Sequence, residues 1–197
     1  MINKLYLSVN DQDRLELHIP STEIDIHRYD EIKILLKALH DTFTLYSEDF
    51  IIEAIVALKN LLEKVLNNEL EVPDSLSKLE IGRLSNDSYQ DIEDDLIYED
   101  ANWIGTKFNV WSTNNLETWL YNKKGEIYIQ VTPVYRWHFA KPKSNDKFSC
   151  YSQFVKEYKI IYKAKIERDN AIQWLNKCKE IINIIEMNQR KSEKGRL

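Results

Sequence analysis

The first residues of the chain alternate between apolar and polar side chains. Residues 5–9 and 14–19 each place their apolar side chains at every second position, and the polar run 10–13 separates them. A period of two is typical of a strand with one buried face, and a short polar run between two such strands predicts a hairpin. Pro20 limits the second strand, because proline has no backbone N–H for the centre of a sheet. We therefore expect the chain to open with a β-hairpin.

The spacing of apolar residues then changes to three and four. Residues 30–45 show it after Asp30, a residue type that commonly caps a helix N-terminus. Residues 48–67 show it over a longer stretch, and acidic side chains suit the positive end of the helix dipole at their start. Residues 169–187 carry a third apolar face of this kind. These spacings predict three helices, at 30–45, 48–67 and 169–187.

Residues 103–132 have the clearest strand pattern, on either side of the turn candidate 122–125. A four-residue loop would pair Leu120 with Ile127 and would sort the side chains by chemistry. One face is then aliphatic, with Leu116, Leu120, Ile127, Ile129 and Val131 beside Thr118. The opposite face is aromatic and polar, with Glu117, Trp119, Tyr121, Tyr128 and Gln130. This sorting predicts a sheet whose two faces differ in chemistry, with the aliphatic face packed on the helices.

The preceding strand fits the same division. Ile104, Phe108 and Val110 fall on the aliphatic face, and Trp103, Lys107, Asn109 and Trp111 fall on the other. This requires a loop of odd length through residues 112–115. Tryptophan and tyrosine are typical of interaction hot spots, so the aromatic face is interpreted either as a partner-binding surface or as a surface covered by another part of the chain. The pattern at 158–164 predicts a further strand.

Together these elements predict a single α+β domain over residues 1–187. An antiparallel β-meander forms its sheet, and the helices pack mainly on the aliphatic face. Residues 67–100 are interpreted as a connector because they contain no long flexible linker. The basic residues of 188–197 predict a flexible tail.

Composition narrows the function classes. Of 197 residues, 43% are hydrophobic and 30% are charged, and the formal net charge is −5. That is enough apolar material for a core, and the deficit of bases argues against nucleic acid and against an anionic membrane surface as partners. No membrane-spanning or signal segment is evident, and Cys150 and Cys178 lack metal-site spacing, so we expect a cytoplasmic protein with reduced thiols.

The charged residues of 87–100 are all acidic. The segment lacks the alternating ligands and central glycine of an EF-hand, so it is interpreted as a solvated loop or as a docking site for a basic protein partner. In the second case Asp91, Asp94 and Asp95 are the candidate binding residues.

Chemical motifs are sparse. His138, beside Arg136, is the one residue on which we base an enzymatic alternative, a hydrolase or transferase of unfamiliar type. Gly-rich phosphate loops, a nucleophile elbow and metal-binding histidine pairs do not occur in the sequence. We therefore predict no cofactor, no metal and no catalytic residue assigned by motif.

The block from Thr118 to Asn122, with Gly125, Ile129–Pro133 and Trp137–Phe139, resembles a segment of small bacterial proteins without an established activity. In size, charge and aromatic content the chain also resembles immunity proteins of bacterial toxin systems. This resemblance implies a non-enzymatic protein-binding module that neutralises a toxin. The candidate docking residues are Trp103, Trp111, Trp119, Tyr121, Tyr128, Asp91, Asp94 and Asp95. A self-associating module that forms a homodimer through the aromatic face is the remaining alternative.

Overall fold

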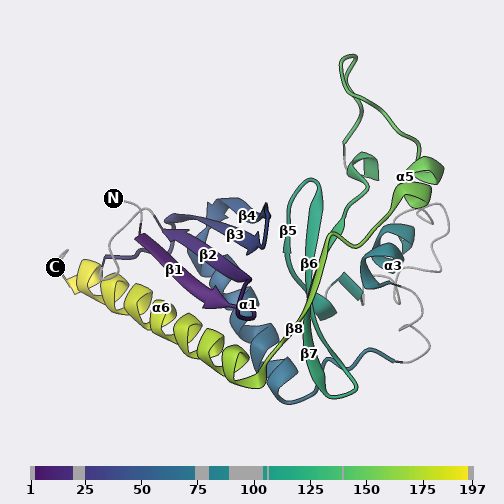
Figure 1. Ribbon diagram of the computed structural model, residues 1–197. Coiled ribbons are helices and arrows are strands. Elements are labelled where there is room, and N and C mark those ends of the chain that lie inside the picture. Colours follow the sequence, from purple (N-terminus) through teal and green to yellow (C-terminus); the bar gives the residue numbers. More distant parts are fainter. Residues whose placement is uncertain are drawn as a thin grey trace.

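In the part of the chain that the structure describes, two four-stranded antiparallel sheets form the framework, and four α-helices pack against them (Figure 1). The computed structural model describes residues 3–19, 25–73, 80–88, 104–105, 107–138 and 140–194. The first sheet has the order β1-β2-β3-β4 and the second the order β5-β6-β7-β8. The predicted α+β class is confirmed.

The first sheet begins with the expected hairpin, β1 (Asn3–Ser8) and β2 (Arg14–Ile19). Leu5 pairs with Leu17, so the alternating leucines lie on one face, and that face is buried. The turn is stabilised by the side chain of Asn10, whose Oδ1 accepts hydrogen bonds from the backbone N–H groups of Gln12 and Asp13, both at 2.9 Å.

The helix predicted for residues 30–45 is wrong. These residues form β3 (Glu31–Ala38) and the first half of β4 (Asp41–Phe50), joined by a turn at residues 39–40. Ile32, Ile34 and Leu36 alternate toward the core, and the additional leucine at 35 on the other face imitates helical spacing. Pairing with β2 and burial of every second side chain override the local helical pattern.

The helix predicted for 48–67 is present as α1 (Ile51–Leu66). It begins later than expected because β4 continues to Phe50. Figure 1 shows α1 between the two sheets, and two hydrogen bonds fix it to the second sheet. Trp111 Nε1 donates to the Ala54 carbonyl at 3.1 Å, and Asn122 Nδ2 donates to the Val65 carbonyl at 2.9 Å. The helix therefore belongs to the cores of both sheets.

The second sheet consists of β5 (Asn109–Ser112), β6 (Leu116–Lys123), β7 (Glu126–Pro133) and β8 (Tyr162–Ile166). The turn between β6 and β7 is shorter than predicted, and Leu120 pairs with Ile129 rather than with Ile127. Lys124 and Gly125 form this turn with φ of 53° and 76°, the left-handed pair that tight hairpins require. Because the register moved by a full period, each residue of β6 and β7 keeps its predicted face.

The face predicted for Trp111 is wrong. Asn109 pairs with Trp119, but Trp111 pairs with Thr118, so the register shifts between residues 109 and 111. This β-bulge turns Trp111 toward the aliphatic face and α1. An irregularity of one residue is not visible in a period-two pattern.

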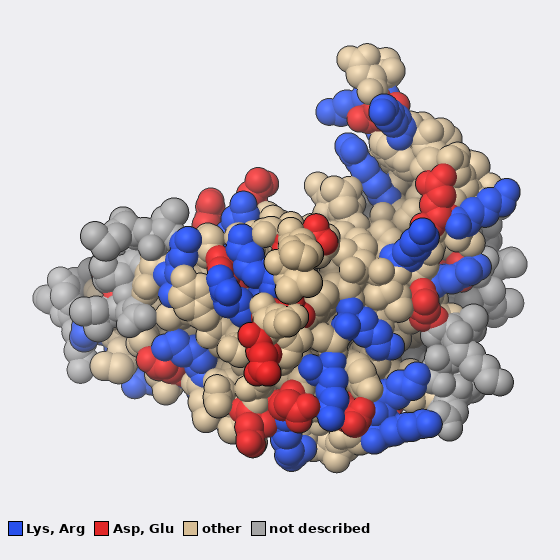
Figure 2. Space-filling model, viewed as in Figure 1, with Lys and Arg blue, Asp and Glu red and all other residues tan. Residues whose placement is uncertain are grey.

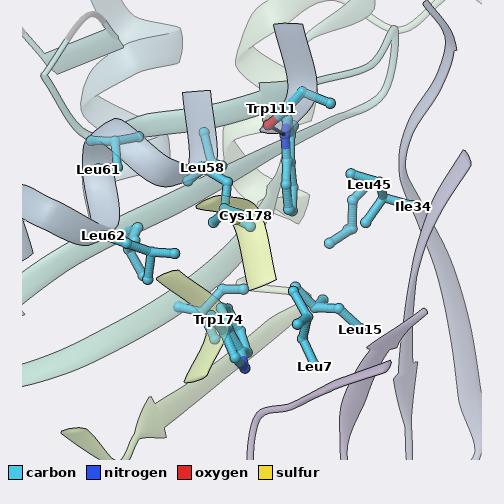
Figure 3. Close-up of a cluster of buried hydrophobic side chains, with 14 of the residues drawn as sticks. Leu7, Leu15, Ile34, Leu45, Leu58, Leu61, Leu62, Trp111, Trp174 and Cys178 are labelled. Carbon is cyan, nitrogen blue, oxygen red and sulfur yellow. Dashed lines mark hydrogen bonds between the residues drawn. The ribbon is translucent and has the colours of Figure 1, made fainter. Parts of the chain in front are cut away.

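The last helix, α6 (Arg168–Lys194), continues well past residue 187, so residues 188–194 are helical where we expected a flexible tail. Its apolar face closes the core between α1 and the first sheet (Figure 3). Figure 3 shows Trp174 and Cys178 of α6 near Leu58, Leu61 and Leu62 of α1. Trp174 Nε1 donates to the Ser8 carbonyl at 2.9 Å, which ties α6 to β1.

Two short helices, α3 (Ile81–Ser88) and α5 (Tyr151–Glu157), accompany the second sheet. α3 packs on the aromatic face of β6 and β7, and its Gly82 lies so close to Thr132 that a Cβ there would come within 2.1 Å of the threonine hydroxyl. The second sheet therefore carries helices on both faces. Among the described residues, no helix combines the length and apolarity that a membrane span requires.

Candidate functional site: a polar cleft between the two sheets

The aromatic side chains proposed as a docking surface are largely core residues. Trp111 and Tyr121 are 2% and 3% exposed, and Trp119 is fully buried. Trp119 Nε1 donates to Thr132 Oγ1, and the Tyr121 hydroxyl donates to Gln130 Oε1, both at 2.8 Å. Burial leaves these three side chains little surface to offer to a partner.

Tyr128 is the half-buried member of the set. Its ring stacks on Tyr121 with centroids 5.8 Å apart, and the Lys163 ammonium lies 5.4 Å from its centroid. Its hydroxyl donates to Glu126 Oε2 at 2.8 Å. Tyr128 is therefore held by its own neighbours. Trp103 and the acidic candidates Asp91, Asp94 and Asp95 lie outside the described residues.

In the described part of the chain, aromatic rings surround His138. Its ring packs against Tyr135 and Tyr151, with centroid distances of 4.9 Å and 5.5 Å. Burial lowers its pKa from the ordinary value, while a hydrogen bond with the backbone of Asn86 acts in the opposite direction. An imidazole placed among phenol rings is better explained by packing than by acid–base chemistry.

A polar cleft of about 690 Å³ lies where the ends of the two sheets meet. Its residues come from the end of β4, from the β5–β6 hairpin and from the segment after β7. They are Ser47, Glu48, Asp49, Ser112, Thr113, Asn114, Glu117, Val134, Arg136 and Ala140. Residues 140–150, called the arm below, project from the body. Figure 2 shows that the surface is hollowed beside the arm. The volume is typical of a ligand-binding site.

A β-bulge shapes the wall that β4 contributes. Ile34 pairs with Tyr46 and Ile32 pairs with Asp49, so β4 carries an extra residue between these pairs. Glu48 has a φ of 63°, a left-handed conformation that is unfavourable for a residue with a side chain. Glu48 and Asp49 are both exposed. The bulge thus presents two carboxylates to the cleft at the expense of local backbone strain.

Glu117 of β6 is among the lining residues of the cleft and is only 6% exposed. Burial raises the pKa of its carboxyl to about 7, although a hydrogen bond with the side chain of Ser85 opposes the shift. Its Oε2 is buried and has no hydrogen-bond partner among the described residues. A buried carboxylate oxygen without a partner is unfavourable, and its lack of accessible surface closes this atom to a molecule in the cleft.

Arg136 is the basic residue of the cleft, and it stands half-exposed at the base of the arm. Its guanidinium lies 3.9 Å from Asp146 Oδ1 and 4.8 Å from the centroid of the Trp137 ring. Trp137 in turn contacts Phe148, with centroids 5.8 Å apart, and Phe148 is 58% exposed. Trp137 and Phe148 thus form a small aromatic contact at the base of the arm, next to the cleft.

The hydroxyl groups of the β5–β6 hairpin serve the turn. Ser112 Oγ donates to Asn109 Oδ1 at 3.2 Å, and Thr113 Oγ1 accepts from the Leu116 N–H at 3.0 Å. Neither contact couples a hydroxyl to a general base, which is what a serine- or threonine-based nucleophile needs. Within the described ranges, no three acidic, histidine or cysteine side chains come together as metal ligands.

Comparison with protein-family models, with curated proteins and with solved structures finds no match. The site rests on the geometry alone. Sequence reasoning placed Glu117 on the aromatic face but did not single it out. The signal was present, because a carboxylate alternating with Trp119 and Tyr121 must be buried wherever those rings are buried.

Proposed function

We propose that this protein is a non-enzymatic binding module that docks a basic protein partner at the cleft and the arm. The observation that carries the proposal is the cleft, to which the end of β4 contributes two exposed acidic residues, Glu48 and Asp49. Their charges would attract a basic partner.

The arm supports the proposal by adding apolar contact area. Phe148 and Trp137 pack against each other and stand beside the acidic cleft. Aromatic side chains at the centre of an interface commonly provide most of its affinity, while surrounding charges set the rate of encounter. A basic bacterial toxin, neutralised on binding, is the partner class that we propose.

A catalytic function is less well supported. The cleft contains carboxylates and Arg136, but His138 is not among its lining residues. The Ser112 and Thr113 hydroxyls are engaged in the hairpin. Recognition requires only the charges and the concave shape that the described residues provide.

The test is comparative capture followed by kinetics. The immobilised protein and its E48Q/D49N variant are exposed to the same lysate, and any protein retained only by the former is purified and titrated. Because the two carboxylates are exposed, the variant should fold normally, and we expect its association rate to fall about 3- to 10-fold at low salt. An equal association rate for the two proteins would contradict the proposal.

The matched control is D25N/E167Q. These carboxylates have exposed fractions of 75% and 70% and do not line the cleft, and the variant changes the net charge by the same amount. An unchanged association rate for this control distinguishes local attraction at the cleft from an effect of total charge.

A further inference from the structure

The first sheet turns one face toward the helices and the other face away from them. Figure 3 shows Leu7 and Leu15 of this sheet beside Trp174 of α6, so their face belongs to the core. Because side chains alternate along a strand, the residues between them lie on the opposite face, here called the open face. Lys and Arg side chains lie over this sheet in Figure 2.

The open face carries cations at two separate levels along its strands. Arg14 of β2 pairs with Lys37 of β3, and His18 of β2 pairs with Lys4 on one side and with Lys33 on the other. Arg14 and His18 are four residues apart on the same strand, so the two levels are about 13 Å apart.

These cations keep donors for a partner. The ion pairs of the described residues do not include Lys4, Lys33 or Lys37. Lys37 Nζ donates to Thr42 Oγ1 at 3.0 Å, which uses one of its three N–H groups. Arg14 uses two of its five N–H groups on a neighbouring carboxylate, and 48% of its side chain is exposed.

Two acidic residues share the open face with the four Lys and Arg side chains. Glu16 is 5% exposed, and Arg14 and His18 already contact its carboxylate. Glu31 is the first residue of β3 and lies at the margin of the face. The open face is therefore positive although the net charge of the chain is −5, and a positive surface attracts an anionic partner.

The level of Arg14 is hollowed. A concavity of about 400 Å³ is lined there by Arg14, Lys37 and His40, and also by the carboxylates of Asp41 and the already paired Glu16. This space admits an acidic side chain between the guanidinium and the ammonium group.

An exposed aromatic ring lies between the two levels of cations. Tyr6 pairs with Glu16, which is midway between Arg14 and His18 on β2. Its ring is 55% exposed, and the Arg14 guanidinium lies 5.4 Å from the ring centroid. A partner that moves along the strands therefore meets a cation, a ring and a second cation at steps of two residues.

This spacing fits an extended peptide. In an extended chain every second side chain points the same way, and the first and last of five residues are about 13 Å apart. Acidic residues at the two ends would reach the two levels of cations, and an apolar residue in the middle would lie on Tyr6. A single-stranded nucleic acid fits less well, because its bases are held by stacking on rings and Tyr6 alone supplies a ring among the described residues of this face.

We propose that the open face of the first sheet binds an extended acidic segment of a partner protein, in which two acidic residues flank a central apolar residue at alternate positions. This surface is different from the cleft, and its partner has the opposite charge. The proposal therefore does not depend on the function proposed above.

The experiment uses capped peptides with glycine at both ends. The probe contains Glu-Thr-Leu-Thr-Glu, the spacing control Glu-Glu-Leu-Thr-Thr and the charge control Gln-Thr-Leu-Thr-Gln. Backbone amide shifts of the full chain are followed by NMR at about 50 mM salt, where charge attraction is weakly screened. We expect the probe to shift residues of β1–β3 with a Kd of about 1 mM, at least about threefold tighter than the spacing control and about fivefold tighter than the charge control.

Variants of the full chain locate the contact. K33Q/K37Q should weaken binding of the probe at least about fivefold, and Y6A should weaken it about two- to threefold. The matched control is K156Q/K159Q, which removes the same charge from exposed positions at α5 and just after it and should leave the affinity unchanged. Unshifted amide signals outside the open face show that each variant is folded.

Three results would overturn the proposal. The first is equal binding of the probe and the spacing control, because attraction would then be unspecific. The second is an equal loss of affinity in K33Q/K37Q and K156Q/K159Q. The third is an oligouridine of about ten nucleotides that shifts the same residues at lower concentration than the probe does, which would identify the face as a nucleic-acid surface.

Discussion

Each sheet buries one glutamate, and the two are treated in opposite ways. Glu16 of β2 is 5% exposed and Glu117 of β6 is 6% exposed. Arg14 donates to Glu16 Oε1 at 2.8 Å, and His18 lies 3.2 Å from Oε2. Burial alone would raise the pKa of Glu16, but hydrogen bonds with His18 and Arg14 and the charges of Arg14 and Lys37 outweigh it and lower the pKa.

No cationic side chain is among the groups that shift the pKa of Glu117. This pKa rises to about 7 because burial is opposed only by the Ser85 contact. Arg14 and His18 lie beside Glu16 on β2 itself, and the charge of Lys37 acts on it from β3. The second sheet is covered on the side of Glu117 by α3, which brings no base to the carboxylate of Glu117. The carboxylate of Glu16 is thus stabilised in its charged form, whereas burial favours the protonated form of Glu117.

The largest expected effect separates the covered face from the open one. Trp119→Ala should lower the free energy of unfolding by about 3–5 kcal/mol, because the ring is fully buried and its N–H bonds Thr132. Tyr6→Ala removes a ring that is 55% exposed on the open face and should change it by less than about 0.5 kcal/mol. Denaturant unfolding measures both, and similar losses would show that the two faces do not differ as described.

The next effect is a difference in pH dependence. The pKa of Glu117 is raised from 4.5 to about 7, so the folded state binds the extra proton and stability falls as pH rises through this window. The free energy of unfolding falls by about 3 kcal/mol over this window. Glu117→Gln removes the titrating group, so this variant should be more stable than the parent above pH 7 and similar to it near pH 4.

Glu16→Gln should behave in the opposite sense. A lowered carboxyl pKa contributes stability above the unfolded value that is lost as pH falls, so this variant should be less stable at neutral pH and should approach the parent in acid. Unfolding curves between about pH 4 and 9 test the pair. Parallel pH profiles for the two variants would remove the distinction between the two glutamates.

The smallest effect concerns the cover itself. Gly82→Ala places a methyl group within 2.1 Å of Thr132 Oγ1, so α3 must move away from the sheet, and we expect a loss of about 1–3 kcal/mol despite the better helix propensity of alanine. Gly105→Ala is the control, because its added Cβ meets nothing within 4 Å. Equal unfolding midpoints for the two variants would show that α3 does not press on Thr132.

Features that depend on the alternation of side chains along a strand could be predicted from the sequence. Features that depend on how strands pair could not. The faces of β6 and β7 were correct even with the wrong turn, since a shift of two residues conserves parity. Trp111 was misplaced because one bulged residue reverses parity. Residues 30–45 were misassigned because Leu35, which is buried on the face of β3 opposite to Ile34 and Leu36, completes a helical spacing that only pairing with β2 can contradict. The cleft joins residues from three separate segments, and no local pattern contains it.

The position of α1 has a consequence for how the chain can change. The helix donates apolar side chains to one sheet and backbone carbonyls, those of Ala54 and Val65, to the other. Neither sheet could be removed from the chain with its core intact, because the cores of both sheets include α1. We therefore expect insertions and fusions to be tolerated at the arm or the hairpin tips. We also expect the two sheets to be retained together in evolution and to unfold in a single transition.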